Sequence, residues 1–95
     1  MDARLIAHAK EVRDDGAIVE IVIWALPRPL SPCRHSYKYR LYFGRSGECL
    51  VRYDNERGKG DHRHFEGAET AYTFTTVEKL MADFWSDVRA LRGNR

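Results

Sequence analysis

Two runs rich in β-forming residues lie on either side of Asp14-Asp15-Gly16, and this arrangement constrains the fold more than any other feature. The runs cover residues 4–12 and 18–26. Asp-Gly between two such runs is a strong signal of a β-hairpin, because both residues tolerate the backbone angles of tight turns. A register that sets Lys10 opposite Glu20 pairs opposite charges, whereas the neighbouring register would oppose two glutamates. The chain is therefore predicted to begin with two antiparallel strands.

A second hairpin is predicted after a proline-rich loop over residues 27–36. Proline lacks the N–H that a central strand needs, so the three prolines of this segment end the ladder. Residues 37–43 then alternate apolar and polar side chains, residues 44–47 form a turn, and residues 49–53 return. Pairing Phe43 with Cys49 stacks the apolar side chains on one face. The same register gathers basic side chains on the reverse face: Lys38, Arg40 and Arg52.

The C-terminal quarter carries the pattern of an amphipathic helix. Thr75 and Glu78 have the spacing of a capping box, and Gly93 suits the helix end. Between the second hairpin and this helix, residues 54–67 are polar and glycine-rich. They are predicted as a loop that leads into a short extended piece, and residues 71–74 are also predicted to be extended. One helix face is apolar and the other is mixed in charge. The apolar positions are Val77, Leu80, Met81, Phe84, Trp85, Val88 and Leu91, and the outward ones include Lys79, Asp83 and Asp87.

These elements predict an α+β fold, an antiparallel sheet of four to five strands with one C-terminal amphipathic helix packed on one face. Residues 1–95 are expected to form a single domain, because no linker or repeat divides them. No run of about 18 apolar residues occurs, so a membrane span is not expected. No secretory signal is visible, and two cysteines do not make a disulfide scaffold. A reduced, cytoplasmic protein is the simplest interpretation.

Positive charge is concentrated in the middle of the chain. Residues 34–64 hold eight Lys/Arg against four Asp/Glu and three of the four histidines, although the whole chain has a net charge of only +2. A local excess of this kind is consistent with phosphate contact, and a solvated face is the alternative. The residues expected to hold a nucleic-acid backbone are Lys38, Arg40, Arg52 and Arg57.

Residues 59–64 carry the most distinctive chemistry. In an extended segment His62 and His64 point to the same face, because strand side chains repeat every second residue. Two imidazoles and nearby cations suit metal-free RNA cleavage, in which one group deprotonates the ribose 2′-hydroxyl and another protonates the leaving oxygen. Lys59 and Arg63 are expected to stabilise the phosphate charge. Tyr53 and Asp54 are expected to orient the histidines.

Other interpretations of these side chains stay open. His62 and His64, with Asp61 or Asp54, form a minimal metal-ligand set, since imidazole and carboxylate suit zinc. The histidines are equally compatible with a structural role, capping turns or pairing with Glu56 and Glu66. Cys33 with His35 lacks a nearby acidic residue in the sequence, so Cys33 is expected to fill space rather than act as a nucleophile. Accordingly, no metal ligand and no cofactor are predicted.

The segment Arg52-Tyr53-Asp54-Asn55-Glu56-Arg57-Gly58-Lys59-Gly60-Asp61-His62-Arg63-His64 resembles the signature of TumE-family toxins of bacterial toxin–antitoxin modules. The resemblance extends to residues 23–27, 35–41, 72–74 and 77–88, and so to nearly the whole chain. It implies a small toxin encoded beside a DNA-binding antitoxin. The expected function is an RNA-acting toxin, a metal-independent ribonuclease that inhibits translation. The alternative is a non-catalytic module that binds nucleic acid or protein.

The expected partners follow from this reading. They are a cognate helix-turn-helix antitoxin, RNA and a second copy of the chain in a homodimer, with no membrane.

Overall fold

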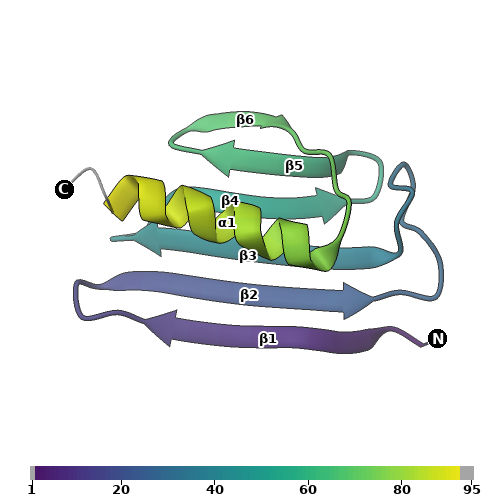
Figure 1. Ribbon diagram of the computed structural model, residues 1–95, viewed down its shortest axis with the longest axis horizontal. Coiled ribbons are helices and arrows are strands. Elements are labelled where there is room, and N and C mark those ends of the chain that lie inside the picture. The colour runs from purple at the N-terminus through teal and green to yellow at the C-terminus, as the bar shows by residue number, and fades with distance from the viewer. Residues whose placement is uncertain (1, 93–95) are drawn as a thin grey trace.

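One antiparallel sheet and one C-terminal helix account for the computed structural model, which describes residues 2–92 (Figure 1). The α+β prediction is confirmed, but the sheet has six strands rather than four to five. Neighbours in the sheet are also neighbours in the sequence, from β1 at one edge to β6 at the other. The elements are β1 (Arg4–Val12), β2 (Ala17–Ala25), β3 (Tyr37–Arg45), β4 (Glu48–Glu56), β5 (Gly60–Phe65), β6 (Ala68–Ala71) and α1 (Val77–Arg92).

The first two hairpins follow the predicted pattern with one correction. Lys10 pairs with Glu20 as expected, and residues 27–36 contain no strand. In the second hairpin, however, Leu41 lies opposite Tyr53, and Cys49 pairs with Gly44 rather than Phe43, so the predicted register was wrong by two residues over most of the ladder. The shift has two causes. The turn consists of only two residues, Ser46 and Gly47, which both have a positive φ, so each strand is longer than predicted. The ladder is also irregular between Phe43 and Gly44. An even shift keeps every side chain on its predicted face.

The predicted loop over residues 54–67 is largely strand. β4 continues to Glu56, a turn follows, and β5 begins at Gly60. Gly58 and Gly60 both have a φ of 84°, in the left-handed region that glycine adopts without a steric penalty. These glycines therefore close a hairpin where the sequence was read as a loop. The turn at Glu66-Gly67 then adds β6 at the sheet edge.

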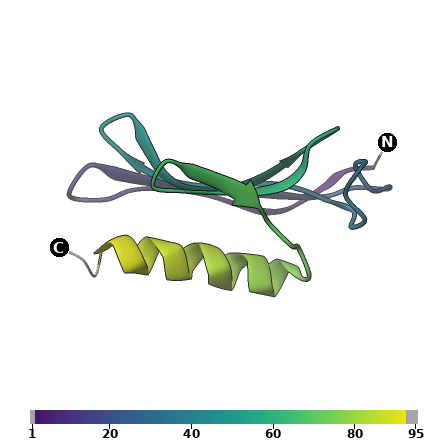
Figure 2. The ribbon, with the colours of Figure 1, turned by 90° about the horizontal axis from the view of Figure 1, so that it is seen from above.

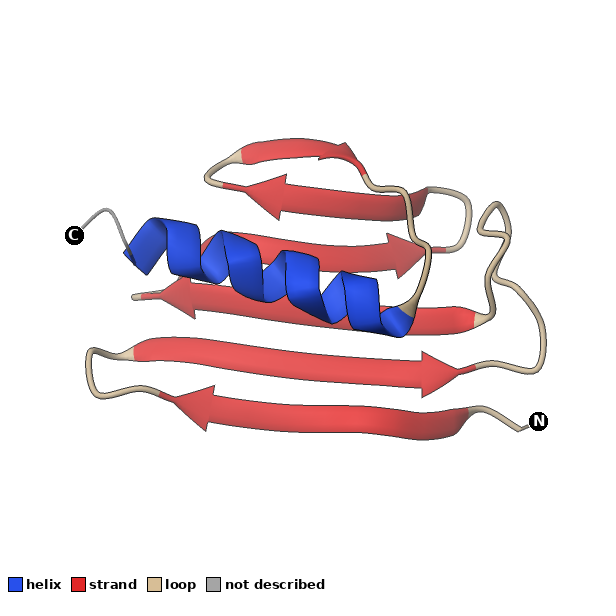
Figure 3. Ribbon diagram, viewed as in Figure 1, coloured by secondary structure: helices blue, strands red, loops and turns tan. Residues whose placement is uncertain are grey.

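The helix covers one face of the sheet, along β3 and β4, and leaves the other face bare (Figures 2 and 3). The capping residue is Thr76 rather than Thr75, since its hydroxyl accepts a 3.0 Å hydrogen bond from the N–H of Lys79. Gly93 lies outside the described residues. The core combines helix and sheet side chains as predicted: Tyr39, Leu41, Phe43, Val51, Tyr53, Leu80, Phe84, Val88 and Leu91. Within residues 2–92, no helix is long and apolar enough to span a membrane.

Candidate functional site

The bare face of the sheet, which we call the open face, brings together the two histidines of the predicted motif. In the register of β4 and β5, His62 lies opposite Asp54 and His64 lies opposite Arg52. These two cross-strand rows, one through each histidine, continue onto β3, where Asp54 pairs with Arg40 and Arg52 pairs with Tyr42. Neighbouring strands lie about 4.8 Å apart, so each histidine has a charged residue on the adjacent strand within side-chain reach. The period of two residues predicted this placement.

His62 is held by two contacts, whereas His64 is free. The Nε2 of His62 lies 3.0 Å from the carbonyl oxygen of Lys59, and its Nδ1 lies 3.6 Å from a carboxylate oxygen of Glu69. A carbonyl accepts a hydrogen bond only from a protonated nitrogen, so Nε2 carries the hydrogen and Nδ1 faces the carboxylate. Among residues 2–92, His64 has no hydrogen-bond or ion-pair partner. Its ring is therefore available to a ligand.

The basic side chains of the open face are largely paired with carboxylates. Arg40 lies 3.6 Å from Glu20, and Arg52 lies 3.3 Å from Asp54. Lys38 donates a hydrogen bond to the backbone carbonyl of Asn55. Because each guanidinium meets an acidic group, the open face is less positive than the basic residues alone suggested. Asp54, predicted to orient the histidines, faces His62 in the register and contacts Arg52.

Tyr53 and Arg63 are not brought to the histidines, because they lie on the helix-facing side. The Arg63 guanidinium donates to both carboxylate oxygens of Asp87 on α1, at 2.8 and 2.9 Å. The Tyr53 hydroxyl donates to the same carboxylate at 2.6 Å. The hydrogen bonds to Asp87 raise the pKa of Arg63. The pKa of Tyr53 is also raised, mainly by burial and secondly by its hydrogen bond to Asp87. Asp87 was expected to face outward, but it ties the helix to the sheet.

The remaining predicted residues lie at the end of the β4–β5 hairpin. Lys59 is exposed and lies 3.5 Å from Glu56, in the turn that His62 contacts through its ring. Arg57 faces away toward the proline-rich loop, where it lines a cavity of about 610 Å³ with residues 26–30 and Asp2. The structural alternative expected the histidines to cap turns or to pair with Glu56 and Glu66. His62 does hydrogen-bond the turn, through the carbonyl of Lys59. Its carboxylate partner, however, is Glu69 of β6, an element that the sequence did not reveal.

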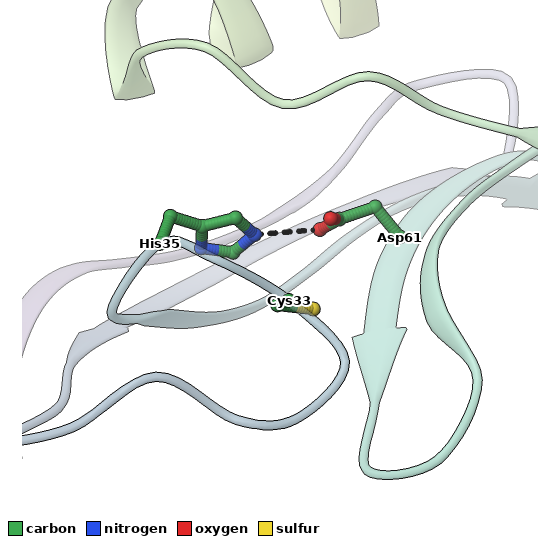
Figure 4. Close-up of side chains that lie close together, drawn as sticks. All are labelled: Cys33, His35 and Asp61. Carbon is green, nitrogen blue, oxygen red and sulfur yellow. Dashed lines mark hydrogen bonds and ion pairs between the residues drawn. The ribbon is translucent and has the colours of Figure 1, made fainter.

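A second group of polar side chains, which we call the Asp61 cluster, was missed by sequence reasoning (Figure 4). Cys33, His35 and Asp61 place their polar atoms within 4.8 Å of one another, and Figure 4 shows the His35 ring pointing at the carboxylate. One oxygen of Asp61 accepts hydrogen bonds from His35 Nε2 at 2.8 Å and from the Tyr39 hydroxyl at 2.6 Å. The acidic partner that Cys33 and His35 seemed to lack thus comes from 26 residues further along the chain.

The protonation of His35 decides what the Asp61 cluster can do. The Tyr37 N–H donates to His35 Nδ1 at 3.2 Å, so in the neutral ring the hydrogen sits on Nε2. A neutral imidazole in that tautomer offers no lone pair to a metal at Nε2 and none to a substrate proton. Burial and the nearby Asp61 also raise the pKa of the Cys33 thiol, which disfavours the thiolate, the nucleophilic form. The cluster therefore suits a structural role, joining the proline-rich loop to β5.

The comparisons with known proteins single out one family. The model of the family described as Toxin TumE matches residues 2–92, which is nearly the whole chain. No curated protein and no solved structure matches the chain.

Proposed function

Because this chain belongs to the TumE family of toxins, we propose that it is the toxin of a bacterial toxin–antitoxin module and cleaves RNA in the cytoplasm without a metal. A cognate antitoxin, of the helix-turn-helix type expected from the sequence, would neutralise it. The proposal rests on one observation. The register sets His62 and His64 together on the open face, beside Arg52 and Asp54, on the side of the sheet opposite α1.

The contacts of the two histidines suggest different roles. His64 has a free ring and is assigned as the base that takes the proton of the ribose 2′-hydroxyl. The resulting oxygen attacks the phosphorus and the bond to the 5′-oxygen breaks, leaving a 2′,3′-cyclic phosphate. His62 is assigned as the acid that protonates the departing oxygen. Its Nε2 hydrogen is held by the Lys59 carbonyl, so Nδ1 is the nitrogen that exchanges a proton.

Cations next to the histidines would stabilise the charge that develops on the phosphate. Arg52 lies opposite His64, and the exposed ammonium of Lys59 belongs to the turn that contacts His62. Both are paired with carboxylates at 3.3–3.5 Å, and an incoming phosphate would compete with Asp54 and Glu56 for them. Arg63 and Tyr53 take no part in this scheme, because their contacts with Asp87 hold them on the other face.

The test uses His62→Gln and His64→Gln, which keep side-chain polarity but remove the titrating ring. Each variant, induced in a bacterial host, should lose growth inhibition, and each purified protein should cleave RNA at least about 100-fold more slowly. His8→Gln is the matched control, because His8 is exposed on the same face at the edge strand β1. Cleavage by the wild type should continue in excess chelator and leave cyclic phosphate ends. Wild-type rates of cleavage in folded His62→Gln and His64→Gln would refute the catalytic assignment.

A non-catalytic binding module is the second candidate, and the paired charges favour it. Since Arg40 and Arg52 already meet Glu20 and Asp54, few cations are free to release counterions from a phosphate chain. A module of this kind would arrest growth by occupying its target. Its signature is retained growth inhibition in the two histidine variants, with no cleavage of RNA by any form of the protein.

A further inference from the structure

Two aromatic side chains lie on the open face, and each has a cation beside it. Trp24 is 37% exposed, although burying a tryptophan normally stabilises a domain of this size. In the register it lies opposite Lys38. Tyr42, on β3, pairs with Arg52, and the guanidinium carbon of Arg40 lies 5.0 Å from the centre of its ring.

The Tyr42 ring lies along its strand rather than standing away from the sheet. A Cβ added at Gly44 would collide with the hydroxyl and with the outer ring carbon, which lies 2.7 Å from that position. Gly44 thus provides the space in which the ring rests. Arg40 is half exposed, and a guanidinium plane is itself a surface on which bases stack. Tyr42 and Arg40 together offer a stacking surface at the β3 end of the two rows that contain the histidines.

We propose that the substrate of the histidine site is single-stranded RNA, which lies across β5, β4 and β3 with one base on Tyr42 and extends toward Trp24 on β2. This inference rests on the proposed ribonuclease function and names its substrate class. Tyr42 is separated from His64 by one strand, which carries Arg52, so the two side chains start about 10 Å apart. A short extended oligonucleotide spans that distance.

The paired charges, together with the exposed Trp24 and the partly exposed Tyr42, favour a single strand over a duplex. A duplex offers its phosphates but keeps its bases stacked inside, so it depends on free cations, which the open face largely lacks. A single strand presents unstacked bases, and stacking on aromatic side chains tolerates any sequence. Because few free cations would contact the phosphates, the affinity for the single strand is expected to depend weakly on salt.

The test measures binding of a 2′-O-methyl oligonucleotide, which cannot be cleaved through its 2′-oxygen, as a single strand and as a duplex. The wild type should bind the single strand at least about 10-fold more tightly than the duplex. Tyr42→Ala and Tyr42→Leu should weaken binding of the single strand about 10-fold, since neither keeps a ring, and Tyr42→Phe should bind like the wild type. Val22→Ala, on the same face in the row of Arg40, is the control and should change binding little.

Trp24→Ala provides an independent measurement if substitution of Tyr42 disturbs the fold, and it should also weaken single-strand binding several-fold. Equal binding of duplex and single strand, or wild-type binding by folded Tyr42→Leu and Trp24→Ala, would overturn the inference. The probe is not cleaved, so this outcome is separate from that of the histidine variants. If the histidine variants lose cleavage while the Tyr42 and Trp24 variants bind the single strand like the wild type, the protein is a ribonuclease of another substrate class.

Discussion

Replacing Asp87 by asparagine should destabilise the domain, because this carboxylate joins α1 to the sheet. It accepts two hydrogen bonds from Arg63 and one from the Tyr53 hydroxyl, all between 2.6 and 2.9 Å. Asparagine keeps the shape and one oxygen but removes the charge and one acceptor. Arg63 would then keep a cation among partly buried groups without its counter-ion.

The size of the effect follows from the burial of the pair. The Asp87 side chain is 14% exposed and the Arg63 side chain 33%. Breaking a fully buried ion pair costs about 3–5 kcal/mol, and an exposed pair contributes about 0–1 kcal/mol. A pair between these limits should cost about 2 kcal/mol. For a domain of 95 residues this corresponds to a fall in Tm of about 8–16 °C.

The assay is urea unfolding followed by circular dichroism, with Arg63→Met and the double variant completing a thermodynamic cycle. The coupling energy between Asp87 and Arg63 should be at least about 1.5 kcal/mol. Glu78→Gln, which removes an exposed carboxylate from the same helix, should cost less than about 1 kcal/mol. A loss below about 1 kcal/mol for Asp87→Asn would show that the pair behaves as a surface pair and that the reasoning is wrong. RNA cleavage by Asp87→Asn, measured well below its Tm, should match the wild type.

Two further predictions concern metal and pH. Excess Zn²⁺ should leave Tm unchanged, because the contacts of the Asp61 cluster keep the His35 hydrogen on Nε2. Specific binding of Zn²⁺ at 100 times its Kd would instead raise the free energy of unfolding by about 2.7 kcal/mol. One zinc ion per chain in elemental analysis would contradict the tautomer argument. For Asp83, burial alone would raise the pKa, but hydrogen bonds from Lys79 and Tyr72 outweigh it and hold the pKa below its usual 3.8. Its contribution to stability is therefore complete above the unfolded pKa and is lost as the pH falls through the lower folded pKa. The urea midpoints of Asp83→Asn and the wild type should therefore converge as the pH falls below the folded pKa. A constant difference between the two proteins from pH 6 to pH 2 would refute that assignment.

Local sequence patterns determined the elements and the faces of this protein. The β-forming runs around the turn at residues 14–16 identified β1 and β2, and alternation with a period of two residues identified β3. The helical spacing behind Thr75 identified α1 to within two residues of its start. The same alternation placed His62 and His64 on one face. Applied strictly, it also sends Arg63 to the other face, and this signal in the sequence was overlooked. These features are predictable because side-chain direction depends only on the local backbone period.

Only the tertiary structure decided the number of strands, the register and the partners of the charged groups. Whether Gly58 and Gly60 close a hairpin depends on β4 offering its edge to β5, which no local pattern specifies. Asp61 meets His35, and Asp87 meets Arg63, across 26 and 24 residues. A contact between distant residues depends on the packing of α1 and the proline-rich loop against the sheet. The sequence therefore identified which residues are chemically capable, and the packing determined which of them serve the fold and which remain open to a ligand.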